Sequence, residues 1–345
     1  MDGISPPEIT DDVAISKIKK YRKKAADTKT LIKGILNGDI TALSQAITLV
    51  ESKNTKHLKL ANEVITACLP HANKSIRIGI TGVPGVGKST FIEALGKHLT
   101  DLGKKIAVLA VDPSSSITKG SILGDKTRME DLVKNPNAYI RPSASGESLG
   151  GVARKTRETI ILCETAGFDT IIIETVGVGQ NETTVHSMVD FFLLLKLAGA
   201  GDELQGIKRG IIEMADAIAI NKADGDNIKA AKLAKVEFNR ALHLYPERES
   251  QWIPKVALCS ALKYEGIDTI WNIILDYITL TRDNKYFETK RNSQNKFWFM
   301  QTIQEQLKSD FFNRKDVKKE LKHQLELIEN QQTTPFASAD ILLNL

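Results

Sequence analysis

Residues 76–90 read Ile-Arg-Ile-Gly-Ile-Thr-Gly-Val-Pro-Gly-Val-Gly-Lys-Ser-Thr, and this stretch decides the fold. Its alternating isoleucines predict a buried strand, and the apolar residues that follow it recur at helical spacing. Between the two, Gly82 and Gly87-Lys88-Ser89 fit the pattern G-x-x-x-x-G-K-[ST]. A strand that enters a helix through glycines points several backbone N–H groups, and the positive end of the helix, at one spot. We therefore expect this loop to bind the phosphates of a nucleotide.

The pattern assigns a role to the polar side chains of the loop. Lys88 is expected to pair with the β- and γ-phosphates, and the Ser89 hydroxyl is expected to coordinate Mg²⁺. The residues predicted to contact the nucleotide here are Gly82, Val83, Pro84, Gly85, Val86, Gly87, Lys88, Ser89 and Thr90. The alternative is a glycine-rich turn with a chance lysine, which the flanking strand and helix disfavour.

Length and composition are those of a soluble globular protein. With 345 residues the chain can form one large domain with appendages, or two domains. The apolar and charged fractions are ordinary, and no apolar run approaches the ~20 residues that span a bilayer. Cys68, Cys163 and Cys259 lie far apart and suggest buried thiols rather than a metal site. The acidic start lacks a signal-peptide core, so we expect a cytoplasmic protein with no membrane partner.

The net charge of +5 is unevenly distributed, because lysine and arginine gather in residues 13–36 and 282–325. Such clusters can bind nucleic acid or a membrane surface, or they can be solvated faces of helices. Aromatic residues do not alternate with the basic ones, and no nucleic-acid-binding module is recognised. We therefore favour solvated helix faces and expect no nucleic-acid partner.

The middle of the chain alternates short apolar runs with helical stretches, which is typical of a mostly parallel sheet flanked by helices on both faces. The expected fold class is α/β, of the P-loop NTPase type. The predicted strands are residues 76–81, 106–111, 170–174, 190–195, 216–220 and 255–259, and loops rich in glycine and polar residues are predicted at 141–157 and 199–210. Functional groups in such sheets lie just beyond the carboxyl ends of the strands.

Two loops that follow these strands are predicted to sense phosphate. Strand 106–111 delivers Asp112 and a polar loop that is a candidate mobile switch. Strand 170–174 ends in Glu174-Thr-Val-Gly177, which matches the D-x-x-G element of nucleotide switches except that glutamate replaces aspartate. The Glu174 carboxylate can hold the Mg²⁺ shell, and the Gly177 amide can bond the γ-phosphate. The alternative is an acidic residue that merely ends a strand.

The next motif predicts which base is bound. Strand 216–220 runs into residues 221–224, Asn-Lys-Ala-Asp, the N-K-x-D arrangement that reads guanine. Its aspartate can accept hydrogen bonds from guanine N1–H and the 2-amino group, and adenine offers neither donor. The last strand runs into residues 260–262, placed like the loop that closes over the base. The residues predicted to contact guanine are Asn221, Lys222, Asp224, Ser260, Ala261 and Leu262.

The two ends of the chain are predicted to be helical. We expect an N-terminal helical extension over residues 1–72, a P-loop domain over 73–281 and a C-terminal helical arm over 282–345. The apolar stripe of the arm is longer than the nucleotide core needs, so it is expected to pack on a second copy of the chain in a closed symmetric dimer. A cofactor-binding stripe is the less favoured alternative.

Together these motifs resemble the methylmalonyl-CoA mutase-associated GTPase family, of the MeaB/ArgK type. The resemblance covers roughly residues 40–345. The segments that carry it are residues 82–90, 111–115, 120–129, 174–180, 204–208 and 221–225. The second, third and fifth of these segments are specific to the family and not to P-loop proteins at large.

The resemblance implies a GTPase that binds GTP or GDP with Mg²⁺ and forms a homodimer through its arm. Its partner is an adenosylcobalamin-dependent acyl-CoA mutase of the methylmalonyl-CoA mutase type, whose cofactor loading it gates and which it protects from inactivation. Matching positions imply that Ser89, Asp112, Asp125 and Glu174 surround Mg²⁺, and that Lys88, Glu174 and Lys208 are catalytic. Lys208 matches the loop that responds to the mutase.

Two other functions are the alternatives. A P-loop kinase would pass phosphate to a protein or a small molecule, but a guanine-reading motif with switch-like loops suits a timer better than a phosphate donor. A binding scaffold with a vestigial nucleotide would not need Lys88, Ser89, Asp112 and Glu174 to be intact. Label that moves from GTP to an acceptor other than water would indicate the kinase, and measurable turnover would exclude the scaffold.

The Lys88→Ala substitution tests the phosphate-binding loop. It removes the cation that neutralises charge on the transferring phosphoryl group, so GTP turnover is expected to fall by orders of magnitude. The fold is expected to persist, because the side chain points into the site. Steady-state phosphate release and circular dichroism measure the two effects, and an active, folded Lys88→Ala protein would place the hydrolysis elsewhere.

Overall fold

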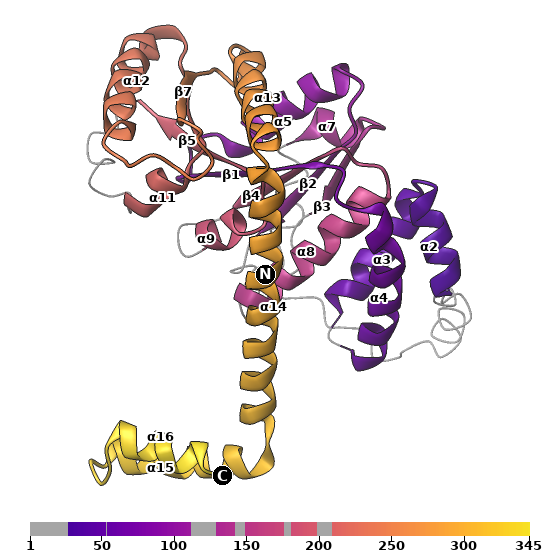
Figure 1. Cartoon of the computed structure of the whole chain (residues 1–345), viewed down its shortest axis with the longest axis vertical. Coiled ribbons are helices and arrows are strands. Elements are labelled where there is room, and N and C mark those ends of the chain that lie inside the picture. The colour runs from indigo at the N-terminus through magenta and orange to yellow at the C-terminus, as the bar shows by residue number, and fades with distance from the viewer. Residues whose placement is uncertain (1–26, 53, 112–128, 142–148, 176–180, 199–208) are drawn as a thin grey trace, which may run out of the picture.

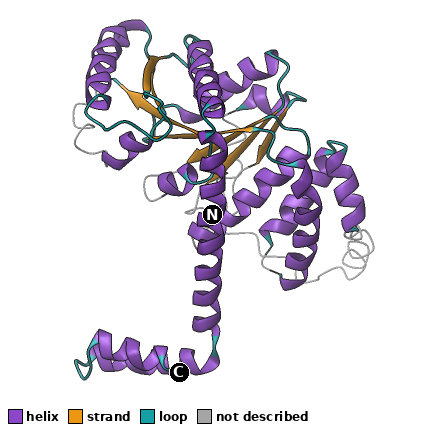
Figure 2. Ribbon diagram, in the orientation of Figure 1, coloured by secondary structure: helices purple, strands orange, loops and turns teal. Residues whose placement is uncertain are grey.

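Seven strands form the central sheet, in the order β3-β2-β4-β1-β5-β6-β7 (Figures 1 and 2). The computed structural model describes residues 27–52, 54–111, 129–141, 149–175, 181–198 and 209–345. The strands are β1 (Ile76–Gly82), β2 (Ile106–Val111), β3 (Ala138–Arg141), β4 (Thr170–Thr175), β5 (Phe191–Leu197), β6 (Ala217–Asn221) and β7 (Lys255–Leu258). Every neighbouring pair runs parallel. All the carboxyl ends therefore meet at one edge of the sheet.

The six predicted strands are all present, which confirms the expected α/β class. The sequence does not predict β3, which has only four residues and of which Tyr139 alone is buried. At the edge of the sheet it pairs only with β2. A short edge strand need not be apolar throughout, so its pattern resembles that of a loop.

Helices cover both faces of the sheet, as predicted. One face packs against α5 (Lys88–Asp101), α7 (Glu130–Lys134) and α13 (Ile267–Asp283), and the other against α8 (Leu149–Thr165), α9 (Asn181–His186), α11 (Arg209–Met214) and α12 (Ile228–Leu242). Residues of β4 alternate between the two layers, since Ile172 joins the α5–α13 layer while Ile171 and Ile173 join the α8 layer. Burial of each such side chain stabilises the fold by roughly 1.5–3 kcal/mol.

The prediction of a loop over residues 141–157 is wrong from residue 149 onward, where α8 begins. Val152, Thr156 and Ile160 are buried on one face of this helix at the i, i+4, i+8 spacing. Glycines in the first turn obscure that pattern in the sequence. Packing of the apolar face against β2, β4 and the N-terminal helices outweighs the low helix propensity of those glycines.

The N-terminal helices pack on the core through α8. They are α2 (Thr28–Leu36), α3 (Ile40–Glu51) and α4 (Thr55–Cys68), followed by the short η1 (Leu69–His71). Leu43 and Ile47 of α3 are fully buried in the same cluster as Ile160 of α8. Asp39 caps α3 because its carboxylate accepts a hydrogen bond from the Thr41 amide at 2.7 Å. These helices therefore extend the helical layer on the face of the sheet that α8 covers (Figure 1).

The C-terminal helices form an arm that extends away from the sheet (Figure 1). The arm consists of α14 (Tyr286–Asn313), which leaves the core, then α15 (Lys315–Glu329) and α16 (Pro335–Leu343) at its far end. Large apolar side chains stay exposed along it, namely Phe299, Met300, Leu307, Phe336 and Leu343. Neither α14 nor any other helix in the described ranges is long and apolar enough to cross a membrane.

A buried network of ion pairs holds the root of α14 against the amino ends of β1 and β5. Arg291 of α14 pairs with Asp190 at 2.7 Å and donates to the Ser75 carbonyl at 2.7 Å. Asp190 also accepts from the backbone amide of Arg77 at 2.8 Å, and the Arg77 guanidinium pairs with Glu164 of α8 at 2.9 Å. The four charged side chains are at least nine-tenths buried. Removing one partner would leave an uncompensated buried charge, which costs about 3–5 kcal/mol.

The free energy of unfolding is expected to depend on pH through His186, at the end of α9. Burial and the nearby Lys290 cation lower the pKa of His186 to about 4, from the ordinary value of 6.5. The folded state therefore binds fewer protons than the unfolded state between these values. The stabilisation is complete above pH 6.5, and it is expected to disappear as pH falls toward 4.

The measurement compares urea unfolding of the wild type and His186→Gln at pH 7 and near pH 4.5. The wild type is expected to lose more free energy of unfolding on acidification than the variant, with a slope of up to one proton. His243→Gln is the matched control, because His243 is exposed. Equal acid sensitivity of the wild type and His186→Gln would contradict the assignment.

Candidate nucleotide-binding site

The predicted phosphate-binding loop lies where β1 ends and α5 begins. The chain turns into the helix at Gly87, whose φ of +92° belongs to the left-handed region that favours glycine. A Cβ atom on Gly87 would approach Asn221 Nδ2 to 2.8 Å, so the packing also excludes a side chain. The phosphate-binding loop therefore lies close to Asn221 at the end of β6. The first backbone amides of α5, from Lys88 onward, face this loop.

Lys88 places its ammonium group against this loop. Its Nζ donates to the carbonyl of Gly82 at 2.8 Å and lies 3.4 Å from that of Val83. The side chain is half-buried at the amino end of α5, where the helix dipole is positive. A fixed cation, a helix amino terminus and a loop of left-handed glycines fit the phosphates of a nucleotide.

Asn221, the first residue of the N-K-x-D motif, joins three loops. Its Nδ2 donates to the carbonyl of Val86 in the phosphate-binding loop at 2.9 Å. Its Oδ1 accepts from the backbone amide of Ala261 at 3.1 Å and from the Cys259 thiol at 3.6 Å. Burial raises the pKa of Cys259 to about 12, so its thiol keeps the proton that it donates. Both polar atoms of Asn221 thus hold the loops together.

Lys222 adds a second contact between the same loops. It has a positive φ of 57°, and its Nζ donates to the carbonyl of Gly85 at 3.0 Å. Asn227 supports the turn from the other side, because its Nδ2 donates to the Lys222 carbonyl at 2.8 Å. Sequence reasoning missed Asn227, for which the only signal is an amide residue just before α12.

Asp224 lies beside the loop that follows β7. The Ser260 hydroxyl donates to its Oδ2, and the backbones of Ser260 and Glu265 exchange two hydrogen bonds of 3.0 and 3.1 Å. Within the described residues, nothing donates a hydrogen bond to Oδ1 of Asp224. The half-buried carboxylate thus keeps acceptor capacity, which suits the adjacent N1–H and 2-amino donors of guanine. Ala261 is buried, whereas Leu262 is 77% exposed.

The predicted magnesium ligands are only partly described. Glu174 is buried at the end of β4, in register with Ile80 of β1 and Ala110 of β2. The next residue, Thr175, donates through Oγ1 to Thr81 Oγ1 at 2.9 Å, which ties β4 to the strand that enters the loop. Ser89 is half-buried in the first turn of α5. Glu174, near the end of β4, and Ser89, which follows β1, thus lie at the carboxyl ends of adjacent strands, as shared Mg²⁺ ligation would need.

Four predicted residues lie outside the described ranges: Asp112, Asp125, Gly177 and Lys208. Asp112 directly follows Val111, the last residue of β2. In the part of the chain that the structure describes, no three His, Cys, Asp or Glu side chains gather as a metal site would need. The set of Mg²⁺ ligands and the catalytic role of Lys208 therefore stay predictions.

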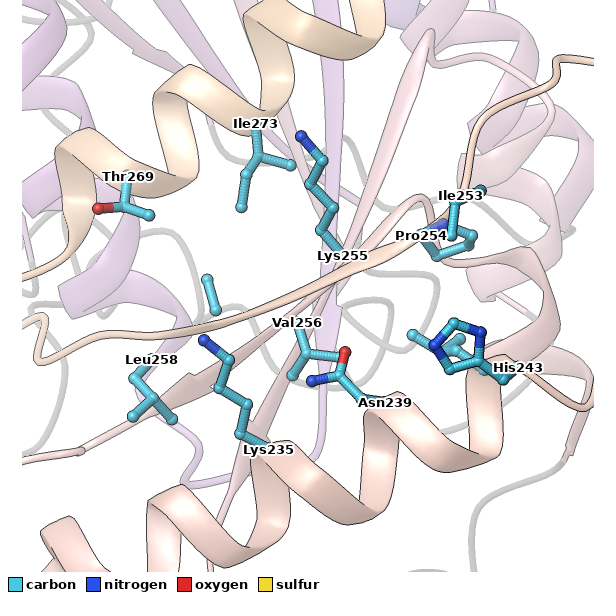
Figure 3. Close-up of a pocket in the computed structure, with 12 residues that line it drawn as sticks. Lys235, Asn239, His243, Ile253, Pro254, Lys255, Val256, Leu258, Thr269 and Ile273 are labelled. Atoms are coloured by element: carbon cyan, nitrogen blue, oxygen red, sulfur yellow. The ribbon is translucent and has the colours of Figure 1, made fainter.

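A groove of about 610 Å³ lies elsewhere, at the free edge of β7 between α12 and α13 (Figure 3). Lys235 and Asn239 extend from α12 toward the strand, and Lys255 extends from the strand toward Ile273 of α13 (Figure 3). None of the residues predicted to bind nucleotide lines this groove. This groove is therefore not the predicted nucleotide site, because the residues predicted to bind phosphate and to read the base meet at the carboxyl edge of the sheet.

Comparison with known proteins gives matches along most of the chain. The family model described as methylmalonyl Co-A mutase-associated GTPase MeaB matches residues 43–316. GTPase ArgK of Escherichia coli (strain K12) is 44% identical over 304 residues, which cover 88% of this chain and 92% of that protein. A Mus musculus protein, methylmalonic aciduria type A homolog, mitochondrial, is 43% identical over 323 residues, covering 91% of this chain and 78% of that protein.

A solved structure shows the same architecture. The crystal structure of a LAO/AO transport system kinase superposes with a TM-score of 0.75 at 36% sequence identity, covering 92% of this chain and 96% of that chain. The match thus includes helices beyond the P-loop core.

Replacement of Asp224 tests the base-reading assignment. ATP would leave the Asp224 carboxylate without its two donors, at a cost of ~1–3 kcal/mol or more, so GTP is expected to outcompete ATP at least about tenfold. Asp224→Asn offers one donor and one acceptor, which mismatches guanine but suits xanthine. The variant is expected to lose GTP affinity and gain affinity for xanthosine triphosphate.

Competition binding of GTP, ATP and xanthosine triphosphate to both proteins decides the matter. The Asn side chain keeps an acceptor for the Ser260 hydroxyl, so the loop after β7 is expected to stay in place. The requirement for Lys88 is expected to be unchanged. Equal affinity of the wild type for ATP and GTP would refute the role given to Asp224.

Proposed function

Because this chain belongs to the methylmalonyl-CoA mutase-associated GTPase family, we propose that its GTPase cycle gates cofactor loading into an adenosylcobalamin-dependent acyl-CoA mutase. In this proposal it also protects the mutase from inactivation. The observation that carries the proposal is the contact of Asn221 with Val86 and Ala261, which brings the phosphate-binding and base-reading loops into one site. The name of the family and that of the mouse relative support a mutase of the methylmalonyl-CoA type as partner.

The residues of the site would divide the work of GTP hydrolysis. Lys88 would move from the Gly82 carbonyl to the β- and γ-phosphates and neutralise charge there. Ser89 and Glu174, with Asp112 and Asp125, would hold Mg²⁺, which would offset the negative charge of the phosphates. Asp224 would select guanine while Asn221 and Lys222 keep the loops together.

Intrinsic hydrolysis is expected to be slow. In many switch GTPases a glutamine directly after D-x-x-G orients the attacking water. In this chain Val178 follows Gly177, and the nearest glutamine is Gln180. A side chain that arrives only with the partner would explain how turnover is coupled to the mutase, and Lys208 is the candidate.

The assembly proposed with this function is a cytoplasmic homodimer. We divide the chain into a helical extension (1–72), a GTPase domain (73–281) and a dimerisation arm (282–345). Support comes from the apolar side chains that are exposed along the arm, among them Phe299, Leu307 and Phe336. A second copy of the arm would cover them in a closed, isologous contact.

A phosphotransferase is the second candidate function, because the superposed structure carries the name of a transport system kinase. Incubation with GTP labelled at the γ-phosphate separates the two. A GTPase releases the label as free phosphate, whereas a kinase transfers it to a protein or a small molecule. Label in an acceptor other than water would favour the kinase.

The role of Lys208 is tested by GTP turnover with and without the cognate mutase. The mutase is expected to stimulate the wild type by tenfold or more, as a group that enters the site in trans does in other GTPases. Lys208→Ala is expected to keep the slow basal rate and to lose most of the stimulation. Lys222→Ala is a poor control because Lys222 contacts the loop, so Lys229→Ala on the exposed side of α12 serves instead.

Equal stimulation of the wild type and Lys208→Ala would remove Lys208 from the mechanism. Absence of any stimulation, together with no mutase in a pull-down from the native host, would contradict the partner itself. The two results are distinguishable, because the first concerns one side chain and the second the whole proposal.

A further inference from the structure

A cavity of about 190 Å³ lies at the amino edge of the sheet, opposite the nucleotide site. Residues of the core and of the arm line it together, including Asn73, Arg77, Ile160, Arg157, Met188 and Asn295. Its walls thus come from β1, α8, the segment before β5 and α14. The cavity has room for several water molecules, and the guanidinium groups of Arg77 and Arg157 line it.

Arg157 is the unusual member of this set. Its Nη2 donates to Asn295 Oδ1 at 2.6 Å, its Nη1 lies 3.5 Å from the Ser187 carbonyl, and the guanidinium stacks on Trp298 at 5.6 Å. Among the described residues, no carboxylate forms an ion pair with it. Its neutral partners accept hydrogen bonds but leave its charge uncompensated.

The neighbouring cations do have acidic partners. Arg77 pairs with Glu164, and Arg291 pairs with Asp190. The opposite charges within each of these two pairs compensate each other, so the positive charge of Arg157 remains uncompensated. Burial, followed by repulsion from Arg77, lowers the pKa of Arg157 to about 10. Arg157 therefore stays protonated at neutral pH in a site that already holds a second guanidinium.

Both guanidinium groups that line the cavity keep unused donors. Arg77 donates through Nε and Nη2 to Glu164 and Asn73, while its Nη1 has no acceptor among the described residues. Arg157 likewise has no acceptor there for Nε. These free donors are accessible to solvent, so water or an anion in the cavity can accept hydrogen bonds from them. The excess positive charge favours the anion.

We propose that this cavity is a binding site for a small oxyanion, such as inorganic phosphate or sulfate, held between Arg77 and Arg157. Planar guanidinium groups match the oxygen spacing of such anions, and their hydrogen bonds to charged acceptors are stronger than those to water. The anion would compensate Arg157 and fill the free donors of both residues.

The position of the cavity gives the anion a structural effect. Asn295 and Trp298, which contact Arg157, both belong to α14, the first helix of the arm. Arg291, one turn before Asn295, anchors the same helix to Asp190. An anion between Arg77 and Arg157 therefore strengthens the junction of arm and core, and its loss loosens that junction.

Sulfate binding to the full chain tests the proposal. The phosphate-binding loop is first filled with Mg²⁺ and a non-hydrolysable GTP analogue, so that sulfate cannot bind there. Titration calorimetry at constant ionic strength, balanced with sodium chloride, then measures the remaining site. We expect one sulfate per chain for the wild type and at least tenfold weaker binding for Arg157→Gln. Arg154→Gln is the matched control on the same helix, because Arg154 pairs with Glu158 and does not line the cavity.

A second variant keeps the test informative if Arg157→Gln folds poorly. Asn295→Asp is nearly isosteric at an exposed position and brings a carboxylate to Arg157. It is expected to abolish sulfate binding and to raise the melting temperature without sulfate. Asn292→Asp, exposed on the same helix and not lining the cavity, adds the same charge and is expected to do neither.

Three results would overturn the proposal. Wild-type protein that binds no sulfate would show that the cavity holds only water. Equal binding by the wild type and Arg157→Gln would place the anion elsewhere. Equal stabilisation of all variants by sulfate would indicate a general salt effect rather than a site.

Discussion

The side-chain amide of Asn221 is the contact on which the nucleotide site depends. This single buried group donates to the Val86 carbonyl and accepts from the Ala261 amide, so it joins loops that follow three different strands. Asparagine suits the position because it carries a donor and an acceptor on one planar group. An aspartate would leave Val86 without a donor, and an apolar residue would leave both backbone groups unpaired. The relative position of the phosphate and base contacts follows from this one residue.

The parallel sheet separates two chemistries. At its carboxyl edge lie the glycine loop, Lys88 and Asp224, which are predicted to present a cation to phosphate and a carboxylate to guanine. At its amino edge lie Arg77, Asp190 and their partners, which fix the arm to the core. Strand β1 connects the two edges, because it begins beside the ion pairs and ends in the glycine loop. At a rise of ~3.3 Å per residue it is about 20 Å long.

Sequence patterns predicted most of the fold because both faces of the sheet are covered. Strand β2 is apolar throughout, β4 contains three consecutive isoleucines, and both strands are buried at every position. The patterns failed where burial is one-sided or propensity misleads: β3 is a short edge strand, and α8 begins with glycines whose low propensity is overcome by packing. For the site, the motifs named Lys88 and Asp224, but not Asn227 or the thiol of Cys259, because a lone amide or thiol has no spacing signal.

The sequence by itself determined the chemistry of this protein. It contains a P-loop, an N-K-x-D motif that is predicted to read guanine, and predicted strands that each precede one of the motifs. These are local patterns, in which neighbouring residues serve one loop. Only the tertiary structure decided which distant groups meet: Asn221 with Val86 and Ala261, and Arg157 with Arg77 beneath the arm. The physical reason is that hydrogen-bond partners and uncompensated charge depend on distance in space, and residues 40 to 135 positions apart leave no periodicity that a sequence pattern could reveal.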